Sequence, residues 1–167
     1  MKIIPIISVV GESGSGKTTF LEKLIRDLKA RNIKVGIIKH HPHSEIEIDR
    51  PGKDTWRHYN AGADAVAIST PGKIAVFKRL EAEMELDAIA QALGDADIIL
   101  TEGYKKGNKL KIEVNRAVNG KSLVSDKPDL IAIVSDIKWD KGVPVFGLED
   151  SAGVADLLIK SFIVTRG

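Results

Sequence analysis

Eight consecutive residues near the start of the chain have the types and spacing that a phosphate-binding loop requires. The stretch GESGSGKT, residues 11–18, fits the pattern G-x-x-x-x-G-K-[ST] in full and stands between an apolar run and a helical pattern. Its glycines have no Cβ, so several backbone N–H groups can point at one phosphate, and the following helix adds partial positive charge. We therefore predict nucleotide contacts at Gly11, Glu12, Ser13, Gly14, Ser15, Gly16, Lys17, Thr18 and Thr19.

Two side chains of this loop are predicted to be catalytic. Lys17 is expected to reach the β- and γ-phosphates of a nucleoside triphosphate, and Thr18 to place its hydroxyl on Mg²⁺. A carboxylate for the same ion follows the apolar run at residues 98–100, where Glu102 precedes Gly103. Asp97 stands before that run, more than about 15 Å from its far end in an extended strand. Glu102 is thus the predicted metal ligand, with Gly103 at the nucleotide. The alternative is a surface glutamate at a strand end.

A third feature concerns the choice of base. The stretch LIAIVSDIKWD ends an apolar run with Ser135 and Asp136, and Lys138 follows. This is a degraded form of the Asn/Thr-Lys-x-Asp pattern of GTPases, with the lysine displaced. A carboxylate accepts hydrogen bonds, so Asp136 suits the donor edge of guanine and repels the acceptor nitrogen of adenine. The alternative is that Asp136 caps a helix or turn.

All four histidines of the chain lie in the stretch KHHPHSEIEIDRPGKDTWRH, residues 39–58. His-rich tracts bind zinc and nickel, so a metal site is one interpretation, and a solvated loop is another. We favour a segment that faces the nucleotide, because it follows a strand as the phosphate loop does. Asp49 and Asp54 are then candidate Mg²⁺ ligands. The histidines are His40, His41, His43 and His58, and the cations suited to polyphosphate are Lys39, Lys53 and Arg57.

The elements that must position these groups alternate along the chain. Strands are expected at residues 3–10, 34–39, 95–103, 109–114, 129–136 and 143–148, and helices at 18–32, 53–60, 85–93 and 151–164. Two further strands, 64–69 and 73–78, flank a turn signal at Pro71 and Gly72 and predict a hairpin. The predicted fold is α/β: a P-loop nucleotide-binding fold with a mostly parallel sheet flanked by helices and a β-hairpin addition. One domain spanning residues 1–167 is expected.

Composition narrows the function classes. Of the 167 residues 43% are hydrophobic and 29% charged, which is typical of a globular protein, and the net charge of +2 gives no reason to expect nucleic acid or a membrane as partner. The chain has no cysteine, which excludes disulfides and thiolate metal sites and suits a cytoplasmic protein. The first apolar run lacks a small-residue cleavage site, and no apolar run reaches the length of a membrane span, so neither a signal peptide nor a spanning helix is expected.

Three stretches together carry a family resemblance. GESGSGKTTFLEKLI, KHHPH…DRPGKDTWRHYNAGADAVAIS and TEGYKK…KIEVNR, in that order and spacing, resemble the molybdopterin-guanine dinucleotide biosynthesis protein B family, MobB. The resemblance covers all but about the last 30 residues. It implies a GTP-binding, weakly hydrolysing accessory protein that is a homodimer and works beside MobA, the molybdopterin guanylyltransferase. The matching positions are residues 11–18, Glu102 and Gly103, with Asp49, Lys53, Asp54 and Arg57, and with Ser135 and Asp136 at the guanine contact.

The resemblance also suggests further ligands. Molybdopterin is an anionic phosphate ester, and Lys105, Lys106, Lys109 and Lys111, with His40 and His41, could bind it, although a solvated charged loop is the alternative. Slow hydrolysis is expected because the only glutamine, Gln91, lies within a predicted helix. The hairpin could form a dimer contact through its open edges. Two other functions stay open: a metallochaperone GTPase that uses the histidines, and a small-molecule kinase or ligase.

Overall fold

The structure is a computed structural model that describes residues 3–41, 49–125 and 128–163. Contacts divide the chain into two compact units. Unit 1 comprises Met1–His40 and Leu86–Gly167, and unit 2 comprises His41–Glu85. The prediction of a single domain over residues 1–167 stays a prediction. The division into units describes which residues contact one another, and it does not say whether each unit folds independently. His43 lies outside the described residues.

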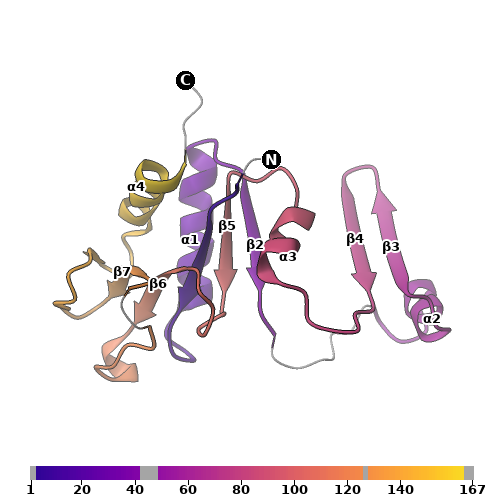
Figure 1. Ribbon diagram of the computed structural model, residues 1–167, viewed down its shortest axis with the longest axis horizontal. Coiled ribbons are helices and arrows are strands. Elements are labelled where there is room, and N and C mark those ends of the chain that lie inside the picture. Colours follow the sequence, from indigo (N-terminus) through magenta and orange to yellow (C-terminus); the bar gives the residue numbers. More distant parts are fainter. Residues whose placement is uncertain (1–2, 42–48, 126–127, 164–167) are drawn as a thin grey trace. The chain divides into compact units, whose positions relative to one another are not determined.

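Unit 1 is built on a six-stranded sheet (Figure 1). In spatial order its strands are β2 (Val35–Lys39), β5 (Ile98–Glu102), β1 (Ile6–Val10), β6 (Leu110–Asn115), β7 (Leu130–Ser135) and β8 (Val145–Phe146). All neighbouring pairs are parallel, so the carboxyl ends of the strands meet at one edge, the lower edge in Figure 1. The predicted α/β class with a mostly parallel sheet is confirmed.

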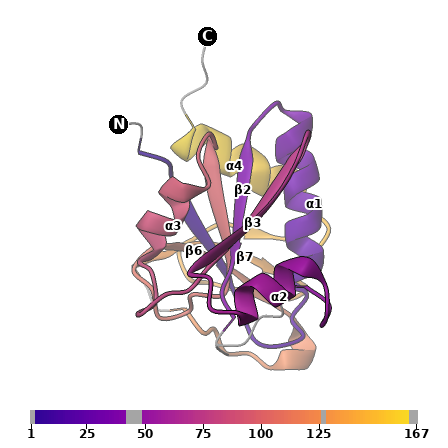
Figure 2. The ribbon, with the colours of Figure 1, turned by 90° about the vertical axis from the view of Figure 1, so that its right-hand side faces the viewer.

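Three helices cover the two faces of this sheet. Helix α1 (Lys17–Ala30) and helix α4 (Ser151–Phe162) share a core cluster with Ile7 and Val9 of β1. Helix α3 (Leu86–Ala92) packs with Ile6 and Ile99 instead, and Figure 2 shows α1 and α3 on opposite sides of the sheet. Successive residues of β1 therefore face different helices, as strand geometry requires. Among the described residues, no helix combines the length and the apolar character needed to cross a membrane.

The start of β1 differs from the sequence prediction. The apolar run begins at Ile3, but the strand begins at Ile6, directly after Pro5. Proline has no N–H to donate to a neighbouring strand, whereas its carbonyl remains available. That carbonyl accepts from the N–H of Ile99 at 2.9 Å, so Pro5 marks the entrance to the sheet rather than a position inside it.

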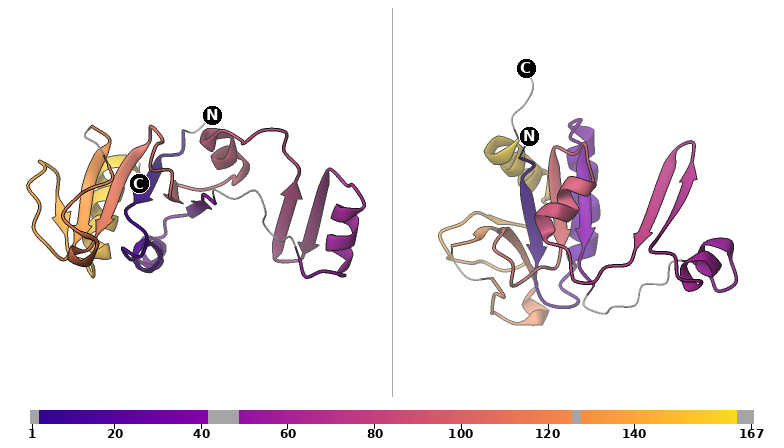
Figure 3. Two further views of the ribbon diagram at one scale, coloured as in Figure 1. Left: turned by 90° about the horizontal axis from the view of Figure 1, so that it is seen from below. Right: turned by 45° about the vertical axis from the view of Figure 1, so that its right-hand side comes forward.

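Unit 2 contains helix α2 (Asp54–Asn60) and an antiparallel hairpin of β3 (Ala65–Thr70) and β4 (Lys73–Lys78). The predicted hairpin is confirmed, and the Thr70 hydroxyl closes its turn by accepting from the N–H of Lys73 at 3.0 Å. Helix α2 contacts β3 and lies next to the hairpin in both views of Figure 3. Arg79 joins helix and hairpin: its guanidinium lies 3.9 Å from the ring centroid of Tyr59 and donates to the Tyr59 carbonyl at 2.6 Å.

A short element that the sequence analysis did not predict follows β6. It is the 3-10 helix η1 (Ala117–Asn119), with Arg116 before it and Gly120 after it. A 3-10 turn of three residues has no apolar periodicity, so hydrophobic patterns do not reveal it. Because it leaves the carboxyl end of a central strand, η1 lies at the edge of the sheet that carries the phosphate loop.

Candidate functional site

The loop of residues 11–16 connects β1 to α1 at the carboxyl edge of the sheet. Its first residue, Gly11, has φ 146°, and a Cβ there would lie 2.2 Å from the carbonyl oxygen of Val114 in β6. Glycine is therefore required for both backbone conformation and space. Ser15 is fully buried, and its N–H donates to the carbonyl of Glu12 at 3.2 Å. The sequence thus forms the compact loop that the motif predicts.

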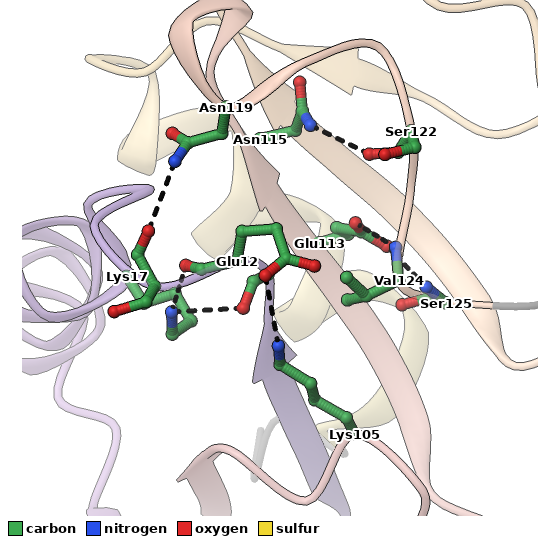
Figure 4. A network of polar contacts seen from close by, with 11 residues as sticks. Glu12, Lys17, Lys105, Glu113, Asn115, Asn119, Ser122, Val124 and Ser125 are labelled. Carbon is green, nitrogen blue, oxygen red and sulfur yellow. Dashed lines mark hydrogen bonds and ion pairs between the residues drawn. The ribbon is translucent and has the colours of Figure 1, made fainter.

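Lys17 reaches back over this loop. Its Nζ donates to the carbonyl oxygens of Gly11 at 3.2 Å and Glu12 at 2.7 Å. Lys105 approaches from the loop after β5, with its Nζ 3.7 Å from the Glu12 carboxylate, as Figure 4 shows. The pKa of the Lys17 ammonium is lowered, first by burial and then by the charge on Lys105. A site in which the charge of Lys105 disfavours the charged form of Lys17 favours a polyanionic ligand.

Glu102 lies where the sequence analysis placed it, beside the phosphate loop. β5 pairs with β1, with Val9 opposite Glu102, and the Thr18 hydroxyl donates to Glu102 Oε1 at 2.7 Å. The Glu102 side chain is only 15% exposed, and Lys39 Nζ lies 3.7 Å from its other oxygen. A hydroxyl and a carboxylate oxygen in contact fit a hard divalent cation such as Mg²⁺, which takes oxygen ligands.

The turn after Glu102 also holds one of the histidines. Gly103 has φ 103°, and a Cβ there would lie 3.3 Å from the His40 Cβ. The His40 N–H donates to the Glu102 carbonyl at 3.1 Å, and its ring lies 4.8 Å from the ring of Tyr104, between centroids. His40 therefore belongs to the edge of the sheet that carries the phosphate loop.

The remaining histidines all belong to unit 2, and His43 lies outside the described residues. His41 and His58 belong to unit 2, where both are exposed. Within residues 3–41, 49–125 and 128–163, no three histidine, aspartate or glutamate side chains are grouped so that they could hold a metal ion. The metal-site interpretation of the histidine stretch stays untested.

Asp136 makes a contact of the kind expected if it caps a helix or turn, which is the alternative to guanine recognition. Its Oδ1 accepts from the N–H of Ala117 at 2.8 Å, which ties the end of β7 to the start of η1. The neighbouring Ser135 hydroxyl accepts from the Ile137 N–H and from the Trp139 indole, both at 3.2 Å. Asp136 is exposed, and its contact to η1 uses one of its two carboxylate oxygens. Guanine recognition by Asp136 stays a prediction.

The other predicted acids, Asp49 and Asp54, lie in unit 2. The Asp49 carboxylate accepts from the Thr55 hydroxyl and from the Arg50 N–H, in that order the two main causes that lower its pKa. Asp54 is exposed and begins α2, where a carboxylate suits the positive end of the helix dipole. Their assignment to Mg²⁺ stays a prediction.

Two residues at the phosphate loop were missed by the sequence analysis. Arg116 Nε donates to the Ser15 carbonyl at 3.2 Å, and Asn119 Nδ2 donates to the Ser13 carbonyl at 3.2 Å. They stand roughly a hundred positions after the loop. Arg116 ends the stretch KIEVNR that carries part of the family resemblance, but that stretch does not indicate a contact with the loop. Only the pairing of β6 with β1 brings them there.

Comparison with known protein families identifies the family of this chain. The sequence profile of the family described as "Molybdopterin guanine dinucleotide synthesis protein B" matches residues 6–136. The chain belongs to the MobB family. The resemblance inferred from the three sequence stretches is thus confirmed, and the matched range contains the phosphate loop, Glu102 and Asp136.

Individual MobB relatives agree over nearly the full chain. The molybdopterin-guanine dinucleotide biosynthesis adapter protein of Escherichia coli is 34% identical over 165 residues, which cover 95% of this chain and 93% of that protein. The adapter protein of Haemophilus influenzae is 36% identical over 157 residues, covering 93% and 88%. The crystal structure of Bacillus subtilis MobB superposes with a TM-score of 0.77 at 29% identity, covering 98% of this chain and all of that one. An adapter role in molybdopterin guanine dinucleotide biosynthesis follows from this membership.

Proposed function

We propose that this MobB member binds GTP with Mg²⁺ in the loop of residues 11–18 and hydrolyses it slowly while serving as an adapter in molybdopterin guanine dinucleotide biosynthesis. The observation that carries the proposal is the 2.7 Å contact between the Thr18 hydroxyl and Glu102 Oε1. It joins the last residue of the motif to the strand-end acid that the motif needs. Both groups stand at the carboxyl edge of a parallel sheet, where ligands of such folds bind.

The cations around the loop support a polyphosphate ligand. Lys17 donates to two carbonyl oxygens, Lys105 approaches Glu12, and Lys39 approaches Glu102. Phosphate oxygens carry full negative charge and are stronger acceptors than carbonyl oxygens. A bound triphosphate would therefore compete with these carbonyl oxygens for the Lys17 ammonium. The positive charge of the three lysines would also speed the association of the triphosphate.

Magnesium would be held by Thr18 and Glu102, with water and phosphate oxygens completing its coordination. When bound, the ion neutralises charge on the phosphates. Slow hydrolysis is expected because the sole glutamine of the chain, Gln91, is an exposed residue of α3 and not a residue of the phosphate loop. Guanine would be recognised by the other carboxylate oxygen of Asp136.

Partners enter the proposal at two places. MobA, the molybdopterin guanylyltransferase, is the expected partner enzyme in the cytoplasm, and the lysines after Glu102 are a candidate surface for molybdopterin. Homodimerisation would use the hairpin: Ile74 is 71% and Val76 61% exposed, and both stand on the same face of β4. The outer edges of β3 and β4 pair with no strand among the described residues, so they are available to a second copy.

Calorimetry on the purified chain tests the nucleotide proposal. We expect GTP to bind more tightly than ATP, and more tightly with Mg²⁺ than without it. Lys17→Ala should lower GTP affinity by about a hundredfold, since a charge-assisted contact contributes up to about 3 kcal/mol. Lys29→Ala removes an exposed lysine at the other end of the same helix and serves as the matched control.

Wild-type affinity in Lys17→Ala would refute the assignment of the phosphate loop. Product analysis with labelled GTP adds a second readout, because a phosphorylated acceptor would point to a kinase instead. For the dimer, light scattering after size exclusion should show a monomer when residues 64–79 are replaced by a short linker. A dimer that persists would exclude the hairpin contact.

A further inference from the structure

Two side chains of the η1 region hold the phosphate loop by its carbonyl oxygens. Asn119 Nδ2 donates to Ser13 O and Arg116 Nε donates to Ser15 O, each at 3.2 Å. Figure 4 shows the Asn119 amide directed at the loop that carries Lys17. Both donors come from the η1 region, so the Ser13 and Ser15 carbonyls are both directed toward that region.

The geometry of the peptide bond relates these two contacts to the direction of the N–H groups that follow each carbonyl. In a trans peptide the C=O and the following N–H point in opposite directions. With Ser13 O and Ser15 O directed at η1, the N–H groups of Gly14 and Gly16 point away from η1. Both glycines have positive φ, 75° and 93°. Loop N–H groups that are directed to one side in this way are suited to bind an anion at the amino end of α1.

Arg116 lies directly against the loop. A Cβ at Gly16 would lie 3.2 Å from Arg116 Nε and 3.3 Å from Nη2. Arg116 is half-buried, and its charge comes last among the causes that lower the pKa of Glu149, after the hydrogen bond and the charge of Lys23. The Arg116 guanidinium thus contacts the backbone of the loop, which favours a role in orienting its peptide groups.

The segment that carries both donors is itself fastened to the sheet. Glu113, 1% exposed, accepts from the N–H groups of Val124 and Ser125 at 2.7 and 2.9 Å. Asn115, 3% exposed, donates to the Ser122 carbonyl at 3.2 Å, and these contacts are drawn in Figure 4. Buried hydrogen bonds such as those of the Glu113 carboxylate and the Asn115 Nδ2 rigidify their surroundings. Arg116 and Asn119 therefore act from a fixed support.

We propose that Arg116 and Asn119 are positioning residues for the polyphosphate of a nucleoside triphosphate: they orient the 13–14 and 15–16 peptides so that the Gly14 and Gly16 N–H groups face the phosphates. This inference rests on the proposed nucleotide binding and adds to it the residues that preform the loop. Preorganised donors bind an anion without reorganising first, so loss of either contact lowers affinity about five- to tenfold, the value of one hydrogen bond.

Calorimetry with two ligands, GTP and inorganic tripolyphosphate, tests the proposal in the presence of Mg²⁺. Asn119→Asp keeps the size of the side chain but replaces the donor with an acceptor, and Arg116→Lys keeps the charge but not the planar donor. We expect both variants to lose affinity for both ligands by the same factor, with Arg116→Ala losing more than Arg116→Lys. Lys121→Ala, an exposed cation shortly after η1, is the control and should bind as the wild type does.

A second readout separates orientation from general damage. The amide ¹⁵N and ¹H shifts of Gly14 and Gly16 should move on tripolyphosphate binding in the wild type, and should already differ in the free Asn119→Asp and Arg116→Lys variants. Unchanged affinities in these variants, with Lys17→Ala still defective, overturn this inference alone. A loss confined to GTP also overturns it, because the contacts would then serve the base. A wild type that binds neither ligand overturns the nucleotide proposal and this inference together.

Discussion

The two compact units use their apolar residues in opposite ways. In unit 1, Ile7, Leu24 and Leu158 are buried between the sheet and its helices. In the described part of unit 2, Val66 is the one buried hydrophobic side chain, while Ile68, Ile74 and Val76 are exposed. Unit 1 thus has a core of its own, whereas a two-stranded hairpin with one helix has little to stabilise it.

This difference separates two tasks. Every predicted site residue whose contacts reach the phosphate loop belongs to unit 1, where a rigid sheet edge can hold groups at fixed distances. Unit 2 instead offers an exposed apolar face and open strand edges, which are features of a contact surface. We expect changes in unit 1 to affect stability and ligand binding, and changes in unit 2 to affect association.

The largest expected effect comes from equal truncations in the two units. Leu24→Ala removes a fully buried side chain of α1 and should lower the free energy of unfolding by about 2–5 kcal/mol. Ile74→Ala removes a side chain that is 71% exposed and should change it by less than about 0.5 kcal/mol. Urea denaturation at low protein concentration, followed by circular dichroism, measures both. Equal losses of unfolding free energy in the two variants would contradict the difference drawn between the two units.

Metal-ligand variants come next in size. Glu102→Gln should reduce the gain in GTP affinity that Mg²⁺ provides by about ten- to a hundredfold, because it removes a carboxylate that contacts Thr18. Of the two unit 2 acids, we expect Asp54→Asn to have the larger effect, since the Asp49 carboxylate is already bonded to Thr55 and Arg50. Calorimetry with and without Mg²⁺ gives the comparison. A larger effect for Asp49→Asn would reverse that order.

A smaller effect is expected for the residue predicted to recognise the guanine base. Asp136→Ala should weaken GTP about tenfold while leaving ATP nearly unchanged, because only guanine offers donors to a carboxylate. The variant also loses the contact to the Ala117 N–H, so a loss common to both nucleotides would instead show that Asp136 acts through η1. Asp140→Ala, another exposed acid after β7, is the control. The proposed homodimer should be unaffected in either variant.

The smallest effect concerns pH. In the free protein burial and then Lys105 lower the Lys17 pKa, and bound phosphate must raise it again, so binding takes up a proton wherever Lys17 is partly neutral. The Lys17 contribution to GTP affinity is then constant below the lowered pKa and falls a few fold as pH rises through it. Lys105→Ala should move this fall to higher pH. Calorimetry from neutral pH upward, in buffers of different ionisation enthalpy, measures the uptake, and a fall at lower pH would contradict the assignment.

Local patterns predicted the elements well. The apolar spacing of Phe20, Leu21 and Leu24 predicted α1, and these residues are buried against the sheet. The loop between β1 and α1 was readable because all its functional groups lie within eight positions. Glu102 could be placed because one apolar run leads directly to it.

The order of the strands in the sheet could not be predicted. β5 inserts between β1 and β2, although β1 and β2 are consecutive strands. That order decides that Glu102, and not another strand-end acid, meets Thr18. The contacts of Arg116 and Asn119 to the phosphate loop depend equally on β6 being the other neighbour of β1. Their residue types are common on protein surfaces, so no composition signal distinguishes them.

The central position of β1 has a consequence for synthesis on the ribosome. The phosphate-loop motif is translated first, but β1 needs β5 and β6 as neighbours, and the loop needs Arg116 and Asn119. Under the proposed function, a nascent chain that carries the whole motif but ends before residue 116 should therefore bind nucleotide more weakly than the finished chain. Full affinity for the proposed nucleotide would then arise only late in translation.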